Sequence, residues 1–230
     1  MSGLSVRCEA VRRVYEADGE DVVALDDIDF DLPAGSATAI VGPSGSGKST
    51  LMTILAGLQR PTSGHVFIGD TDLTTLTERG LLGLRSSALA VVVQNAHRNL
   101  IPYGSVDDNL RFALRGSTNS DRLPDRRELL GQLGLAALVD VRVDRLSGGE
   151  RQRVALATGL VTGPDVLLAD EPTSQLDEAN RDAIVDLLRH INDETGVTIM
   201  AVTHDQFVAD RLGRSIAIHD GRIVQSGVTL

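Results

Sequence analysis

The chain has 230 residues, 42% of them hydrophobic, and a formal net charge of −10. This length suits one sizeable domain with a filled core. The negative charge argues against non-specific binding of nucleic acid or anionic lipid, because the average field of the protein repels both. Cys8 is the only cysteine, which excludes an intrachain disulfide and favours the reducing cytoplasm. No export signal or membrane-spanning run is expected, so any membrane role requires a partner chain.

The first third of the chain predicts a β-rich region around one helix. Apolar residues mostly alternate in 24–32, and a Pro-Ala-Gly turn leads into a second strand, 36–41. After a glycine-rich stretch, 48–58 reads as a helix and 65–69 as another strand.

The middle of the chain, from 77 to about 160, is expected to be mainly helical. Thr77 and Ser105 are expected N-caps, and Pro124 lies near another helix start. A short apolar run, 88–93, interrupts this region as a strand.

The last third predicts strands that alternate with helices. Two apolar strands, 165–170 and 197–202, are separated by a helix, and 215–227 is a hairpin that turns at Asp220-Gly221. Strands alternating with helices imply an α/β fold with a mainly parallel sheet, joined to an antiparallel front piece and a helical insert. One face of the helix carries the apolar residues Ile184, Leu187, Leu188 and Ile191.

A phosphate-binding loop is predicted between the strand ending at Val41 and the helix that follows. Gly42, Gly47, Lys48 and Ser49 fit the pattern G-x-x-x-x-G-K-[ST]. Glycines let successive N–H groups surround an anion, and the helix N-terminus adds partial positive charge. Lys48 is the only lysine of the chain, and its slim ammonium can bend over the loop to phosphates where a guanidinium would not fit. The alternative is a glycine-rich turn with a chance lysine.

Two later segments, 146–153 (LSGGERQR) and 165–172 (DVLLADEP), follow the loop in order. Together with it they resemble the nucleotide-binding domain of ATP-binding cassette (ABC) proteins. The resemblance covers essentially the whole chain. It implies a single ABC ATPase domain over 1–230, of the P-loop NTPase fold, with a mainly parallel core sheet, an antiparallel β subdomain and a helical subdomain at about 95–160.

Two adjacent acids are the predicted centre of the chemistry. Asp170 ends an apolar strand, where its carboxylate can meet Mg²⁺, and Glu171 beside it can polarise an attacking water. The alternative for such a pair is a solvated turn. The resemblance implies that His204 is a switch residue that reaches the γ-phosphate, and that Gln94 is a hinge that touches Mg²⁺ or water and reports to a membrane partner.

Further site residues rest on the resemblance. Ser147 with its two following glycines opens a predicted helix and suits an anion, which in the family is the γ-phosphate bound to the opposite subunit. A plain N-cap without a ligand is the alternative for Ser147 alone. Asp177 matches the aspartate of the dimer seam, and Tyr15 the aromatic that stacks on adenine; a solvated cap and core packing are the alternatives. The expected nucleotide ligands are Tyr15, Gly42, Pro43, Ser44, Gly45, Ser46, Gly47, Lys48, Ser49, Thr50, Ser147, Gly148, Gly149 and Asp177; the expected catalytic residues are Glu171, His204 and Gln94, and the metal ligands Ser49, Gln94 and Asp170.

The sequence therefore predicts an ATP-hydrolysing subunit that requires ATP and Mg²⁺ and works as a dimer, expected to be a homodimer, under a transmembrane permease at the cytoplasmic face of the cell membrane. Nucleic acid is not an expected partner. Residues 72–85 and 91–110 resemble the ATPases of lipoprotein release, macrolide and peptide export, and cell-division mechanotransmission. Two alternatives stay open: a non-transporting ATPase that gates an extracytoplasmic enzyme, and a soluble ABC ATPase of DNA repair. The expected docking groove is 94–103, with Leu100 and Ile101 at the surface beside Arg98. The alternative is that both residues pack inside the helical subdomain.

Overall fold

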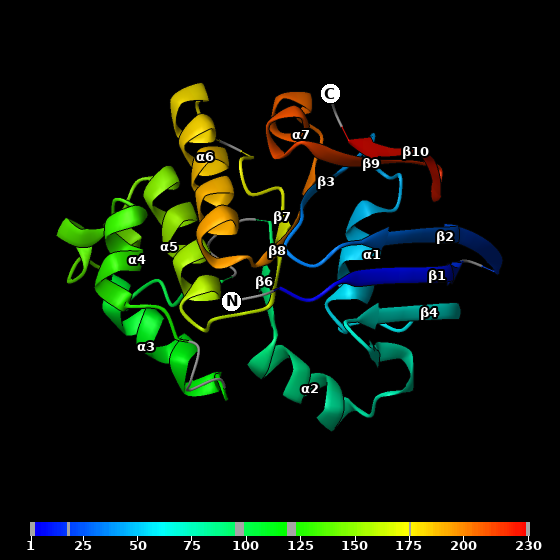
Figure 1. Ribbon diagram of the computed structural model, residues 1–230, viewed down its shortest axis with the longest axis horizontal. Coiled ribbons are helices and arrows are strands. Elements are labelled where there is room, and N and C mark those ends of the chain that lie inside the picture. The colour runs from blue at the N-terminus through cyan, green and yellow to red at the C-terminus, as the bar shows by residue number, and fades with distance from the viewer. Residues whose placement is uncertain (1–2, 18, 95–98, 119–122, 175, 229–230) are drawn as a thin grey trace.

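Two β-sheets and a set of helices make up the structure (Figure 1), a computed structural model that describes residues 3–17, 19–94, 99–118, 123–174 and 176–228. Over these residues the first sheet has four antiparallel strands, in the order β2-β1-β4-β5, and the second has six, in the order β10-β9-β3-β8-β7-β6. The strands are β1 (Val6–Ala17), β2 (Glu20–Leu32), β3 (Ala37–Val41), β4 (Ser63–Ile68), β5 (Thr71–Asp72), β6 (Leu89–Val92), β7 (Val166–Asp170), β8 (Thr198–Thr203), β9 (Arg214–His219) and β10 (Arg222–Val228).

The helices divide between the two sides of the six-stranded sheet. In Figure 1, α3 to α6 gather on one side, whereas α1 lies between that sheet and the antiparallel strands. Short 3₁₀ turns lie at Leu73–Thr75, Ala136–Leu138 and Val143–Arg145. The helices are α1 (Lys48–Leu55), α2 (Glu78–Ser87), α3 (Val106–Gly116), α4 (Arg126–Gln132), α5 (Gly148–Leu160), α6 (Glu178–Thr195) and α7 (Gln206–Leu212).

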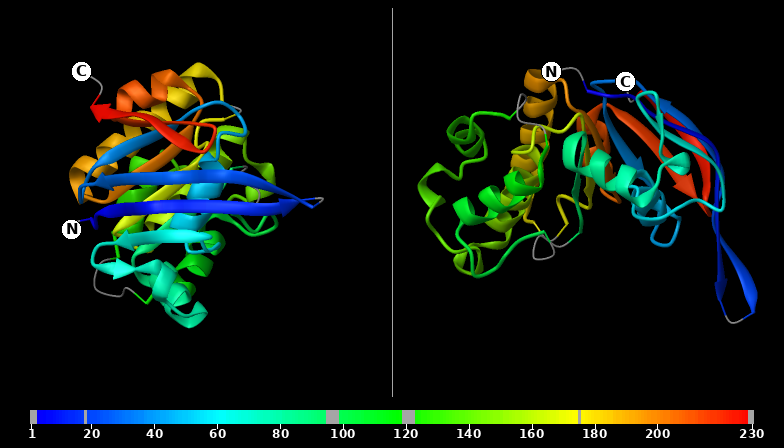
Figure 2. Two further views of the ribbon diagram at one scale, coloured as in Figure 1. Left: turned by 90° about the vertical axis from the view of Figure 1, so that its right-hand side faces the viewer. Right: turned by 90° about the horizontal axis from the view of Figure 1, so that it is seen from below.

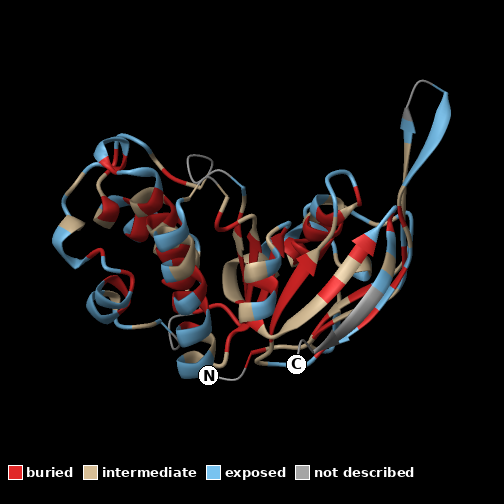
Figure 3. Cartoon of the chain, turned by 90° about the horizontal axis from the view of Figure 1, so that it is seen from above, coloured by how far each residue is buried: buried red, intermediate tan, exposed pale blue. Residues whose placement is uncertain are grey.

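The six-stranded sheet is mainly parallel, and its central strands β3, β8 and β7 are buried on both faces, drawn in red in Figure 3. Along β7, Leu167 and Ala169 join the core on the helical side, and Val166 and Leu168 join the core that faces α1 and the antiparallel sheet. Parallel strands covered on both faces explain the continuous apolar runs of the sequence. The expected α/β class with an antiparallel piece is confirmed.

Local sequence signals also predicted where several helices begin and where one hairpin turns. Thr77 caps α2 by accepting the Gly80 N–H, and Ser105 forms a capping box with Asp108 at the start of α3. The expected β9–β10 turn is present, with φ of 47° at Asp220 and 74° at Gly221. The apolar face expected on α6 is buried.

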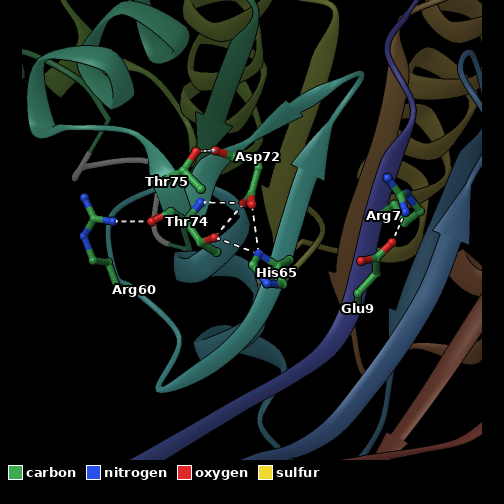
Figure 4. A network of polar contacts seen from close by, with 7 residues as sticks. All are labelled: Arg7, Glu9, Arg60, His65, Asp72, Thr74 and Thr75. Carbon is green, nitrogen blue, oxygen red and sulfur yellow. Dashed lines mark hydrogen bonds and ion pairs between the residues drawn. The ribbon is translucent and has the colours of Figure 1, made fainter.

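The antiparallel sheet has two features apart from its core. Figure 2 shows the turn end of the β1–β2 hairpin projecting beyond the other strands. A polar network fastens β4 and β5 to the chain after α1 (Figure 4): His65 Nδ1 lies 2.8 Å from Asp72 Oδ2, and Arg60 donates to the carbonyl of Thr74 at 2.7 Å.

Candidate functional site

The strand order brings four distant segments to one edge of the six-stranded sheet. The neighbours β3, β8, β7 and β6 run parallel, so the residues after their carboxyl ends lie side by side, where ligands of open α/β sheets bind. A pocket of about 560 Å³ opens there. It is lined by Ala24, Ser44, Gly45, Gly47, Lys48, Ser49, Thr50, Gln94, Asp170, Glu171, Val202 and His204.

The loop 42–47 curls at the mouth of this pocket into α1. Gly47 has φ of 102°, and a Cβ added there would lie 2.5 Å from the carbonyl oxygen of Ala24, so only glycine fits. The Lys48 side chain is buried, and its Nζ donates to the carbonyls of Gly42 at 2.8 Å and Pro43 at 2.6 Å. The loop therefore encloses the ammonium at the helix N-terminus. Gly42, Pro43 and Ser46 shape the loop without lining the pocket.

Asp170 is the last residue of β7, and its Oδ1 is buried with no hydrogen-bond partner among the described residues. Burial is the main cause that raises the pKa of this carboxyl, and the charge of Glu171 raises it further. The charge of Lys48 lowers the pKa by a smaller amount. A buried carboxylate oxygen without a partner costs free energy unless a cation or a hydrogen-bond donor pairs with it. Together with the Ser49 hydroxyl on the same pocket wall, it supplies the oxygen donors that a hard divalent cation prefers.

Glu171 is held in an unusual conformation next to Asp170. Its φ of 49° lies in the left-handed region, which a non-glycine residue adopts only where its surroundings impose it. Its N–H donates to the carbonyl of Val202 at 2.9 Å, and its Oε1 lies 2.8 Å from Nδ1 of His204. The conformation aims the carboxylate into the pocket, with His204 at its side.

Gln94 follows β6 and is exposed on the pocket wall. Asn99, which the sequence did not single out, holds the chain beside it: its Oδ1 accepts the N–H of Val93 at 3.2 Å, and its Nδ2 donates to the Val93 carbonyl at 3.0 Å. Asn99 stands seven residues after the end of β6, and asparagine is a residue type that favours turns, a signal that could have been noticed. Within the expected docking segment, Arg98 lies outside the described residues.

Two helix starts that carry expected nucleotide ligands do not line the pocket either. Ser147 caps α5, its hydroxyl and N–H engaged with the Glu150 carboxylate at 2.8 and 2.7 Å. These hydrogen bonds lower the pKa of Glu150. Asp177 caps α6 by accepting the Asn180 N–H at 2.9 Å. The pocket of one chain thus lacks Ser147, Gly148, Gly149 and Asp177 among its lining residues.

Tyr15 also lies off the pocket. Its hydroxyl donates to Gln59 at 2.8 Å, and the Arg13 guanidinium lies 4.6 Å from its ring centroid. Stacking on adenine stays a prediction.

The expected exposure of Leu100 is wrong. Leu100 is 7% exposed and packs in the core on the helical side, and Ile101 is half-buried. The cause is Asn109, whose side chain hydrogen-bonds both the N–H and the carbonyl of Ile101 and holds the loop against the core.

The family model described as ABC transporter matches residues 25–174. The lipoprotein-releasing system ATP-binding protein LolD 1 of Caulobacter vibrioides is 38% identical over 224 residues, which cover 96% of this chain and 95% of that protein. The methionine import ATP-binding protein MetN of Bradyrhizobium diazoefficiens is 40% identical over 227 residues, 96% of this chain. The chain spans 65% of the length of that MetN.

A solved structure gives the same result. A dimeric ATP-binding cassette in a post-hydrolysis state, bound to ADP and Pi, superposes with a TM-score of 0.84 at 33% identity, covering 98% of this chain and 99% of that one. None of the helices within the described ranges is long and apolar enough to cross a bilayer. The chain belongs to the ABC transporter family, as an ATP-binding ATPase cassette of that family.

Proposed function

We propose that this chain binds ATP with Mg²⁺ in the 560 Å³ pocket and hydrolyses it as a dimer that drives a partner permease. The observation that carries the proposal is the junction, in one pocket, of the loop around Lys48 with Asp170, Glu171 and His204. A cation, the N–H groups of a helix start, a buried acid and a base at one sheet edge are the parts that phosphoryl transfer to water requires.

Lys48 and the N–H groups of the loop bind the phosphates. The ammonium now bound to the carbonyls of Gly42 and Pro43 exchanges these partners for phosphate oxygens. Ser44, Gly45 and Thr50 complete the wall on which the phosphates rest. The carbonyl contacts hold the ammonium at the pocket.

Glu171 orients water and accepts its proton. As the water oxygen bonds to the γ-phosphorus, the bond from that phosphorus to the bridging β,γ-oxygen breaks, ADP leaves, and the water proton passes to the Glu171 carboxylate. His204 holds this carboxylate through the contact between Nδ1 and Oε1. Gln94, on the same wall, is within the pocket where the water is positioned.

The residues fit Mg²⁺. The unpartnered Asp170 Oδ1 and the Ser49 hydroxyl would hold it, with Gln94 beside them. When bound, the ion neutralises charge on the β- and γ-phosphate oxygens. No group of three or more His, Cys, Asp or Glu side chains suited to a metal occurs in the described part of the chain, in keeping with a cation that relies on one carboxylate and on substrate phosphates.

A second copy completes the site. The helix start at Ser147 and Gly148 is exposed and offers N–H groups and partial positive charge, yet it does not line the pocket of its own chain. Face-to-face pairing of two copies places it over the nucleotide of the partner, with Asp177 at the seam. The solved neighbour is dimeric.

The permease anchors the dimer at the cytoplasmic face of the membrane, and the chain reaches the membrane only through it. The docking surface is the stretch that follows Gln94, in which Tyr103 is 75% exposed. Tyr103 is nine residues on from the pocket-lining Gln94, and tyrosine, with an apolar ring and a polar hydroxyl, is enriched at protein interfaces. The formal charge of −10 supports a protein partner over nucleic acid.

The test is the Glu171→Gln variant. We expect it to bind ATP but to turn over roughly 10²-fold more slowly or worse, because a positioned base is lost. ATP and Mg²⁺ will then trap a dimer on a sizing column. Glu128→Gln, the same change on an exposed side chain of α4, is the control and should behave as the parent. Parental hydrolysis by Glu171→Gln, with a monomer in ATP, would contradict the proposal.

A further inference from the structure

We propose that Arg181 is a positioning residue that holds His204 through Asp205; the inference rests on the function proposed for His204. Arg181 lies in the first turns of α6. Asp205 directly follows His204 and is the N-cap of α7, accepting the Phe207 N–H at 2.9 Å. The two helices meet at this ion pair, next to the pocket.

Asp205 is fixed from several directions. Nη1 of Arg181 lies 3.4 Å from Oδ2 of Asp205. The backbone N–H of Asp205 donates to Oγ1 of Thr203 at 3.0 Å. His204, between Thr203 and Asp205, has a side chain that is 70% exposed. Little packing therefore restrains the imidazole itself, so its direction toward Glu171 depends on the backbone that Arg181 and Thr203 hold.

The contact suits an arginine. The guanidinium lies 4.1 Å from the ring centroid of Phe207, and its Nε and Nη2 contact the Asp182 carboxylate at 3.0 and 2.9 Å. One planar group thus joins Asp182, Asp205 and the Phe207 ring, which a lysine ammonium cannot do. With only 22% of the side chain exposed, the pair is less screened than a surface ion pair.

The same turn of α6 carries Asp177. The Arg181 N–H donates to the Asp177 carbonyl at 2.9 Å, so the cap proposed to face the second chain and the clamp on Asp205 move together. Closure of the dimer against Asp177 is thereby transmitted to His204. Arg181 makes the position of the switch residue depend on the seam.

The experiment is a double-mutant cycle on ATP hydrolysis with Arg181→Ala, His204→Ala and the double variant. We expect Arg181→Ala to lower kcat by about tenfold and to change KM for ATP by less than about twofold. The double variant should be no slower than His204→Ala alone, because residues that act through one another are non-additive. A merely structural contribution would instead lower the rate equally in both backgrounds, and that result would overturn the proposal.

Arg211→Ala is the matched control. Arg211 also lies over Phe207, at 5.5 Å, and pairs with Asp186 of α6, but no contact with Asp205 is found among the described residues. The Arg211→Ala variant should lower Tm to an extent similar to Arg181→Ala and keep the parental kcat. An equal loss of kcat in Arg181→Ala and Arg211→Ala contradicts a role through Asp205. If His204→Ala itself hydrolyses ATP at the parental rate, the proposed function fails, whereas a slow His204→Ala with a parental Arg181→Ala refutes only the role of Arg181.

Discussion

At the scale of single residues, Lys48 is unusual because it is the only lysine, and the structure gives a reason for a lysine at this position. All other fixed positive side chains of the chain are arginines. The Nζ of the single lysine lies within 2.8 Å of two loop carbonyl oxygens. A guanidinium is planar and wider than an ammonium, and the enclosure leaves no path for it. Shape as well as charge therefore selects the residue.

The expected result for Lys48→Arg is a loss of ATP affinity of more than about tenfold, although the charge is kept. Binding of a fluorescent ATP analogue measures it. Arg85→Lys is the reciprocal control, because Arg85 also donates to a backbone carbonyl, that of Gly57 at 2.7 Å, outside the pocket lining. Parental affinity in Lys48→Arg would show that the lysine is an accident of composition.

Asp170 makes the protein without nucleotide sensitive to pH. Its pKa is raised, so the folded state binds this proton more tightly than the unfolded chain does. The resulting stability is present below the ordinary pKa of aspartate and is lost as pH rises through the raised value. Asp170→Asn removes the titration. Without nucleotide, its Tm should exceed that of the parent at neutral pH, and the gain should vanish below about pH 4.

Thermal unfolding at several pH values measures this difference. Asp108→Asn is the control of opposite sign: hydrogen bonds from Ser105 lower the pKa of Asp108, so its contribution is present at neutral pH and lost on acidification. Asp108→Asn should therefore lower Tm at neutral pH. An Asp170→Asn variant no more stable than the parent at neutral pH contradicts the assigned burial cost.

At the scale of elements, the sequence predicted regular segments and failed at an irregular one. Strands β3, β7 and β8 were evident because both faces are buried. β1 was not predicted as a strand, because Val6, Cys8 and Val11 point inward at spacings of two and then three. A register shift there, with φ of 48° at Ala10, breaks the alternation that a strand pattern requires.

Contacts between elements were the other part beyond the reach of the sequence. The pocket acids and the loop were predicted because each stands beside a strand end. Arg181 and Asp205, 24 positions apart, carry no local pattern that joins them. Leu100 was placed at the surface because nothing in its neighbours indicated that Asn109, eight residues on from Ile101, would tie the loop down. Such pairings follow from tertiary packing alone.

At the scale of the whole molecule, the docking proposal predicts where a permease is crosslinked. Cys8 is buried, and burial and the charge of Asp29 raise the pKa of its thiol, so an introduced cysteine reacts alone. Tyr103→Cys, treated with a thiol-to-amine crosslinker in membranes of cells that also express the permease, should yield an adduct with an integral membrane protein. Mass spectrometry of the adduct identifies it.

Val224→Cys is the control for position. Val224 is 65% exposed on β10, at the sheet edge opposite β6. It should give no such adduct. Equal crosslinking at both positions, or none at Tyr103→Cys, would refute docking beside Gln94 and leave the ATPase proposal intact.

The pairing of β3 with β8 has a consequence for synthesis on the ribosome. β3 ends at Val41, and its neighbours are β8, which begins at Thr198, and β9, which begins at Arg214. During translation the Lys48 loop therefore emerges long before the strands that flank it. Until then the apolar residues of β3 lack their sheet partners, and such nascent chains expose aggregation-prone surface. A ribosome stalled before β8 would hold a chain that cannot yet close its nucleotide pocket, so nucleotide stabilises this protein only after β8 and β9 have emerged.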